Sequence, residues 1–180
     1  MTPERRTAAM FLSPLVPMLR RRGHDPDTVL GRHGITLADT MNPETRVTVR
    51  QTDRVLRECE TLLGDASLGI SMARHAEYAT FGALGLALAA GGDLYSVLNR
   101  IVRFHRLISD AVCTELREEK ERLGLHLVAM DEPAPNPQAL LFVLAMIQRM
   151  VRIRLPGEGD AVEIITPAIP HAMAQAMQRY

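Results

Sequence analysis

The sequence predicts an α+β fold in which a helical first half packs on a small, mainly antiparallel sheet. From the start of the chain to about residue 108, apolar residues recur at intervals of three or four, which is the period of an amphipathic helix. After Asp110 the pattern changes to alternation of apolar and polar residues, which is the period of a half-buried strand. Helical segments followed by strands indicate helices set against one face of a sheet.

Cap residues and glycines mark the limits of the expected helices. Asp and Thr side chains accept hydrogen bonds from the free N–H groups of a first helical turn, and a glycine often follows the last turn. Gly82 and Gly85 lie in a segment of small apolar residues, where they would let neighbouring backbones approach closely. The expected helices cover residues 10–22, 25–34, 48–64, 68–75, 81–90 and 93–108, and residues 41–46 are expected to form a loop.

The second half of the chain predicts a hairpin, a buried helix and two further elements. The residues that share one face of the hairpin are Val112, Thr114, Leu116, Leu123, Leu125 and Leu127. The charged stretch 118–121 is expected to be its solvated turn. After a proline-rich connector at 133–137, Asn136 and Pro137 begin a helix that is apolar nearly all round through Ile147. A third strand is expected at 162–165 and a final helix at 170–179.

Length and charge indicate a single soluble domain spanning residues 1–180. The 180 residues are 47% hydrophobic, which is enough to bury one core. The 21 basic and 21 acidic residues are interspersed, so we expect no DNA binding by this chain alone. Cys59 and Cys113 do not form a disulfide scaffold and are expected to be reduced. With no signal peptide and no apolar run of roughly 20 residues, we expect a cytoplasmic protein without membrane contact.

The sequence gives no indication of catalysis. It contains no glycine-rich phosphate loop, no nucleophile-elbow pentapeptide and no paired-cysteine motif. Its six histidines do not occur at metal-ligand spacing, and neither cysteine lies near another ligand. We therefore predict a protein that is not an enzyme, with no catalytic residues, no metal site and no cofactor.

Three candidate ligand contacts are an imidazole and two aromatic rings. Ligand pockets are mostly apolar and contain a few placed polar groups. His105 lies on the apolar stripe of the helix expected at 93–108, where it either faces a ligand cavity or forms a backbone hydrogen bond within the core. Phe81 and Phe142 either touch a ligand or fill the core.

Arg103 and Arg149 are the other two candidate ligand-binding residues. Both lie on largely apolar helices, where an unpaired guanidinium would be costly to bury. They would therefore bind an anionic group of a ligand or pair with a carboxylate such as Asp110 or Glu115.

A series of short blocks carries a resemblance to a known family. The blocks are Arg32–Ile35, Asn42–Val47, Leu63–Gly69, Phe81–Gly85 and Arg103–Asp110. In order and spacing they resemble the arabinose-binding-like N-terminal domain of AraC-type transcriptional regulators, in the branch typified by an ornithine-utilisation regulator. The sequence departs from that pattern at Leu86, where an aromatic residue is usual, and at Gly91–Asp93, which replace a polar turn with proline.

The resemblance implies one part of a two-part switch. In such regulators the N-terminal domain binds a small-molecule effector and often forms a homodimer, while C-terminal helix-turn-helix motifs read the promoter. We expect this chain to be the sensing domain, truncated before its last strand, and to reach DNA only through a C-terminal domain that it lacks. Because helix-turn-helix dimers place their reading helices about one DNA turn apart, a change of protomer geometry can regulate binding.

Two other functions stay open on the sequence. A domain of the same kind that has lost its ligand would serve only for dimerisation, with a collapsed core and an exposed apolar helix face. A small enzyme would need a cleft with a strongly perturbed acid, base or nucleophile. An effector sensor predicts a closed pocket between sheet and helices with one or two polar anchors.

Overall fold

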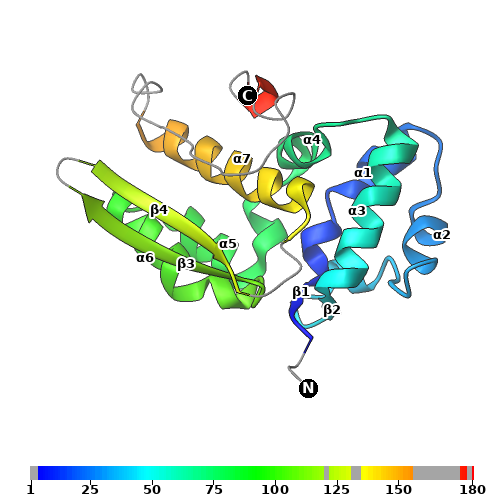
Figure 1. Cartoon of the computed structure of the whole chain (residues 1–180), viewed down its shortest axis with the longest axis horizontal. Coiled ribbons are helices and arrows are strands. Elements are labelled where there is room, and N and C mark those ends of the chain that lie inside the picture. Colours follow the sequence, from blue (N-terminus) through cyan, green and yellow to red (C-terminus); the bar gives the residue numbers. More distant parts are fainter. Residues whose placement is uncertain (1–3, 120–121, 131–134, 156–174, 178–179) are drawn as a thin grey trace.

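The computed structural model describes residues 4–119, 122–130, 135–155, 175–177 and 180 (Figure 1). Its helices are α1 (Leu15–Arg21), α2 (Pro26–Gly31), α3 (Val49–Leu63), α4 (Leu68–His75), α5 (Gly82–Ala89), α6 (Leu94–Phe104) and α7 (Pro137–Arg154). Its strands are β1 (Arg6–Ala8), β2 (Arg46–Thr48), β3 (Val112–Glu119) and β4 (Arg122–Ala129). Short 3₁₀ turns lie at Ala9–Leu12, Asp39–Met41, Tyr78–Phe81 and His105–Leu107.

The α+β class is confirmed, and the two small sheets formed by the described residues are antiparallel. Strands β3 and β4 form the predicted hairpin, with Leu116 opposite Leu125 on the face that packs against the helices. The pairing extends to Glu119 and Arg122, so residues 118 and 119 belong to the strand rather than to the predicted turn. The strand predicted at 162–165 lies outside the described residues, as does most of the helix predicted at 170–179, of which 175–177 are helical.

The sheet formed by β1 and β2 was not predicted. Each strand has only three residues, too few to establish an alternating pattern. The pair closes on the segment that leads into β3: Thr7 bridges Ser109, and the backbone N–H of Arg6 donates to the Asp110 carboxylate at 2.6 Å. The Arg46 guanidinium donates to the backbone carbonyls of residues 106 and 108. Strand β1 therefore connects the start of the chain to the segment that precedes β3.

Local capping chemistry determines where the helices begin, as predicted. Asp25 accepts hydrogen bonds from the first turn of α2, and Asp93 accepts one from Ser96 in α6. Thr48 and Gln51 form a reciprocal capping box at the start of α3. Asn136 accepts a hydrogen bond from the first turn of α7, which Pro137 begins.

Helix lengths differ from the prediction at four places, the first being α2, which ends at Gly31 rather than at Gly34. The segment expected as one helix over 10–22 is a 3₁₀ turn followed by α1, because Pro14 has no N–H to continue a helical ladder and instead stands at the N-cap. Helix α6 ends at Phe104, and His105 begins a 3₁₀ turn that leads the chain toward the β1 contact. Helix α7 continues past the predicted Ile147 to Arg154.

In the described part of the chain, the buried apolar residues form two clusters that meet along α7. Helices α1–α4 pack around the first cluster, which includes fully buried Leu56 and Phe142. Helices α5 and α6 and the hairpin enclose the second, to which α7 contributes Met150. Ile108 packs against both clusters. Figure 1 shows α7 lying between the hairpin and the group of helices α1–α4.

Two glycines permit close backbone contacts, one between α5 and the turn before it and one between α4 and α7. A Cβ on Gly85 would lie 1.6 Å from the carbonyl oxygen of Tyr78, so α5 can approach the preceding 3₁₀ turn only with glycine there, as the sequence predicted. A Cβ on Gly69 would lie 2.2 Å from the Gln138 carbonyl oxygen and 2.8 Å from the Leu141 Cβ, where α4 crosses α7. The α4–α7 contact therefore requires glycine, which has no side chain, at position 69.

Among the residues whose placement the structure gives, no helix combines the length and the apolar character that a membrane span requires.

Replacing Gly69 with Ala is expected to lower the free energy of unfolding by about 2–3 kcal/mol, because the added methyl group forces α4 away from α7. Gly31→Ala is the matched control, since Gly31 is exposed in α2 and an added Cβ would have nothing within 4 Å. Alanine there is expected to be neutral or slightly stabilising. Urea denaturation measures both, and equal effects would contradict the assigned close approach.

Candidate functional site

The two predicted aromatic contacts lie together in the core. Phe142 on α7 is fully buried and stacks with Phe81, whose ring centroid is 5.9 Å away. Phe11 meets the same ring edge-on at 4.8 Å. Phe142 has two aromatic partners, so its position is explained by packing, and a ligand role for Phe81 and Phe142 stays a prediction.

Arg149 lies on α7 and binds the end of α4. Its Nη1 donates to the carbonyl oxygens of Ala73 and Ala76 at 3.2 and 3.0 Å. These carbonyls belong to the last turn of α4 and the residue after it, where a positive charge also complements the helix dipole. The concavity beside Arg149 measures only about 10 Å³. In this structure the guanidinium thus has a packing role, and neither of the expected carboxylates is its partner.

Arg103 lies on α6 beside a much larger concavity. This concavity measures about 450 Å³, is open to solvent and lies between α5 and α6. The residues that line it are Ala87, Ala90, Asn99, Arg100, Arg103 and Phe104. It is a shallow, open depression, whereas most small-molecule sites enclose the greater part of their ligand. The expected partners of Arg103 are engaged elsewhere, because Asp110 accepts from the backbone of Arg6 and Glu115 pairs with Arg117 at 2.9 Å.

His105 lies just beyond the end of α6, rather than on its apolar stripe as predicted. Its Nδ1–H donates to the carbonyl oxygen of Val102 at 2.8 Å. This is the backbone hydrogen bond that was one of the two expected alternatives, and the ring is only partly buried. Of the five candidate residues, the structure brings only Phe81 and Phe142 together, and only Arg103 lines the larger concavity.

Sequence reasoning did not select Asn99, Arg100 and Phe104 as ligand contacts. Asn99 and Arg103 are four residues apart on α6, as are Arg100 and Phe104, so each pair shares a helix face. That spacing could have shown from the sequence alone that Asn99 lies beside Arg103 on the helix surface. The opposite wall of the concavity, Ala87 and Ala90, could not be identified, because only the packing of α5 on α6 places those alanines there.

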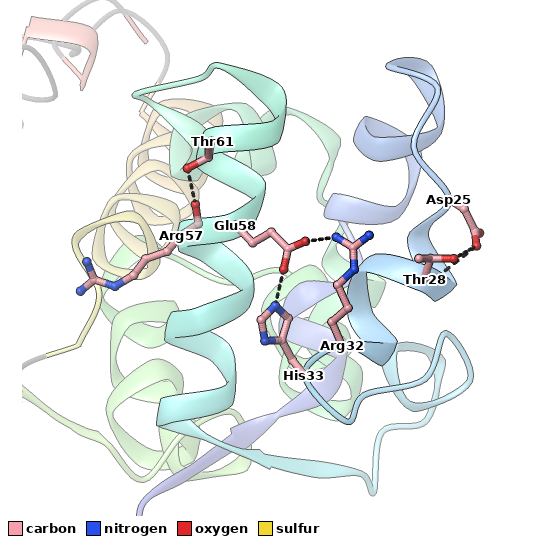
Figure 2. A network of polar contacts seen from close by, with 7 residues as sticks. All are labelled: Asp25, Thr28, Arg32, His33, Arg57, Glu58 and Thr61. Atoms are coloured by element: carbon pink, nitrogen blue, oxygen red, sulfur yellow. Dashed lines mark hydrogen bonds and ion pairs between the residues drawn. The ribbon is translucent and has the colours of Figure 1, made fainter.

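A cluster of polar side chains connects the end of α2 to α3, and its contacts indicate a structural role. Figure 2 shows the Glu58 carboxylate between Arg32 and His33. Arg32 Nη1 and His33 Nε2 each donate to it at 2.6 Å. Partial burial acts to raise the pKa of Glu58, but these hydrogen bonds and the neighbouring positive charges outweigh it and hold the pKa below its ordinary value. Arg32 and His33 thus both bind the same carboxylate, which favours a structural role for the cluster.

The other reactive groups among the described residues are a buried thiol and two buried polar atoms. Burial, with a smaller contribution from the Glu58 charge, raises the pKa of the Cys59 thiol to about 12, so this thiol stays protonated at neutral pH. Within the described ranges no group of three His, Cys, Asp or Glu side chains is arranged to hold a metal ion. Two buried side-chain atoms, Thr114 Oγ1 and Gln148 Oε1, have no hydrogen-bond partner there. Such atoms are uncommon in folded proteins.

Comparison with known families identifies the class of protein. Residues 23–180 match the family model described as the arabinose-binding domain of AraC transcription regulators, N-terminal. The class is that of regulatory ligand-binding domains, which are not enzymes. The chain belongs to the family of N-terminal arabinose-binding domains of AraC transcription regulators. A search of curated proteins gave no match.

Replacing Glu58 with Gln is expected to cost about 1–2 kcal/mol of stability at pH 7, because a partly buried charge-assisted contact is lost. The pKa of Glu58 is lower in the folded state, so its contribution is present above the unfolded value and is lost as pH falls through the folded value. The difference between wild type and variant should therefore shrink as the pH falls below the ordinary range of a glutamate pKa. Urea denaturation across this pH range measures it. Exposed Glu44→Gln is the control, and a difference independent of pH would contradict the assignment.

Replacing Arg149 with Met is expected to lower stability by about 1–2 kcal/mol, because two carbonyl groups at the end of α4 lose a charged donor. Arg152→Met, at an exposed position on the same helix, is expected to have little effect. Chemical denaturation of the three proteins tests the packing role. Equal stability of both variants would show that Arg149 is free for another role.

Proposed function

We propose that this chain is the effector-sensing domain of a DNA-binding transcription regulator. It binds a small molecule and thereby controls a helix-turn-helix domain of the full protein. The regulator acts in the cytoplasm as a homodimer, and contact with DNA is made through that other domain. The match of residues 23–180 to the AraC-type N-terminal family carries the proposal. Membership of the ornithine-utilisation branch stays a prediction from the sequence blocks.

The arrangement of the core supports a sensing role. A ligand that changes the packing of α5 and α6 acts on the second hydrophobic cluster, which meets the first along α7. An allosteric domain needs such a connection, since a ligand changes an equilibrium only by its different affinity for two arrangements. Of the five candidate residues, Arg103 is the one that we propose contacts the effector. His105, Arg149, Phe81 and Phe142 have packing or backbone contacts elsewhere in the fold, and any ligand contact by them stays a prediction.

A ligand-free dimerisation domain is the second candidate function. The larger concavity is open, whereas an enclosed pocket was expected for a sensor. Large apolar side chains are also exposed on successive elements of the second cluster: Leu86 on α5 is 69% exposed, Tyr95 on α6 is 51% and Leu107 after it is 48%. Exposed apolar residues of this size are what a subunit interface would cover.

An effector is expected to raise the melting temperature of this chain, because a ligand specific for the folded state stabilises it by mass action. At a hundred times its dissociation constant the gain is about 2.7 kcal/mol, or about 5–10 °C for a domain of this size. Differential scanning fluorimetry against sugars including L-arabinose, amino acids, polyamines, fatty acids and aromatic acids measures it.

The same screen separates the two candidate functions when it is combined with sedimentation. A reproducible shift by one chemical class supports the sensor. No shift from any class, together with a dimer that Leu86→Gln dissociates, would replace the sensor with the dimerisation domain. Leu123→Gln on the hairpin is the matched control, because Leu123 is also an exposed leucine, at 38%.

A further inference from the structure

We propose that the concavity between α5 and α6 binds the carboxylate of a small organic acid, with Arg103 as the charged anchor. This inference rests on the proposed sensing function and names the chemical class and the position of the effector. It is carried by two observations: the different states of the two arginines that line the concavity, and its apolar walls.

The two arginines that line the concavity are not equivalent. Arg100 Nη1 donates to the carbonyl oxygens of Ala87 and Gly91 at 3.0 and 2.6 Å, and so closes the end of α5. Its charge also contributes, after hydrogen bonds from Ser96, to the lowered pKa of Asp93. Arg100 is therefore fixed in place and largely compensated by its surroundings.

Arg103 is exposed to solvent, and no carboxylate of the described residues pairs with it. Its guanidinium lies 5.2 Å from the centroid of the Phe104 ring, and within the described part of the chain it forms no hydrogen bond or ion pair. Stacking on an aromatic ring orients a guanidinium while its N–H donors stay free. Those donors match the two oxygens of a carboxylate, which is the strongest ordinary pairing of an arginine.

The rest of the lining matches a short apolar body. Ala87 and Ala90 form the α5 wall, and the Phe104 ring forms part of the α6 wall. Asn99 donates its amide N–H to the carbonyl oxygen of Tyr95, which leaves its side-chain oxygen as an acceptor at the edge. An acidic head with an apolar body fits these walls, whereas a polyamine would meet two positive charges.

The test uses phenylacetate as the probe and phenylacetamide, its uncharged analogue, as the matched comparison. Backbone amide NMR titration of the whole chain gives both the affinity and the location. Phenylacetate is expected to shift the amide signals of residues 87–91 and 99–104. Its affinity is expected to fall at least about tenfold for phenylacetamide and for Arg103→Gln, because one charge-assisted contact is lost.

Two further variants make the result independent of any one substitution. Ala90→Phe fills the concavity from the exposed end of α5 and is expected to weaken phenylacetate binding without touching Arg103. Arg54→Gln removes an exposed arginine on α3 and is expected to leave the affinity unchanged. The amide spectrum of each variant also reports whether it is folded.

Three results would overturn the inference: equal affinity for the acid and the amide, equal affinity of the Arg103→Gln and Arg54→Gln proteins, or no shifts in the two segments. If L-arabinose or another compound then binds elsewhere, the sensing function stands and only this site is wrong. If no compound class stabilises the chain, the sensing function fails with it.

Discussion

Both hydrophobic clusters depend on helix α7, which contributes side chains to each of them. The position of α7 is set by its close contact with α4. The two backbones meet at Gly69, and the buried Gln138 side chain joins three elements there. Its amide N–H donates to Glu60 on α3 and to the carbonyl oxygen of Ala66, and its oxygen accepts from the Gly69 N–H. A buried amide with every group satisfied fixes one arrangement, because any shift would leave a polar atom unpaired. At its other end α7 holds α5, where Arg154 donates to the Leu88 carbonyl oxygen.

The second junction between the clusters is made by backbone groups. Strands β1 and β2 close on residues 106–110 through the Thr7 bridge and the carbonyl contacts of Arg46. Helices α5 and α6 and the hairpin are thus joined to the helices α1–α4 through α7 and this short sheet. A ligand between α5 and α6 would act on a part of the domain with defined connections to the remainder. Such a geometry suits a domain of a regulator, whose ligand must influence a distant surface.

The candidate ligand contacts show where sequence reasoning loses information. Phe81 and Phe142 were identified as apolar, but apolar character does not separate a core ring from a pocket wall. Arg149 was expected to pair with a carboxylate or an anion, and it binds two backbone carbonyls instead. Every residue has a backbone carbonyl acceptor, so the sequence does not show which carbonyl groups an arginine will bind. Arg103 was selected as a cation on an apolar helix. Its position beside Asn99 on α6 could be predicted from their spacing, whereas the position of the alanines opposite them could not.

The sequence by itself determined the local elements, the α+β class and the family. Helix starts at Asp25, Thr48, Asp93 and Asn136 depend on hydrogen bonds within one turn, so neighbouring residues suffice to predict them. The hairpin follows from alternation in the same way. Tertiary structure alone decided the β1–β2 pairing, the division of the interior into two clusters, the end of α6 at Phe104 and the place of the larger concavity. Each of these depends on contacts between segments far apart in the chain, whose strength comes from shared burial and close approach rather than from the preference of any single residue.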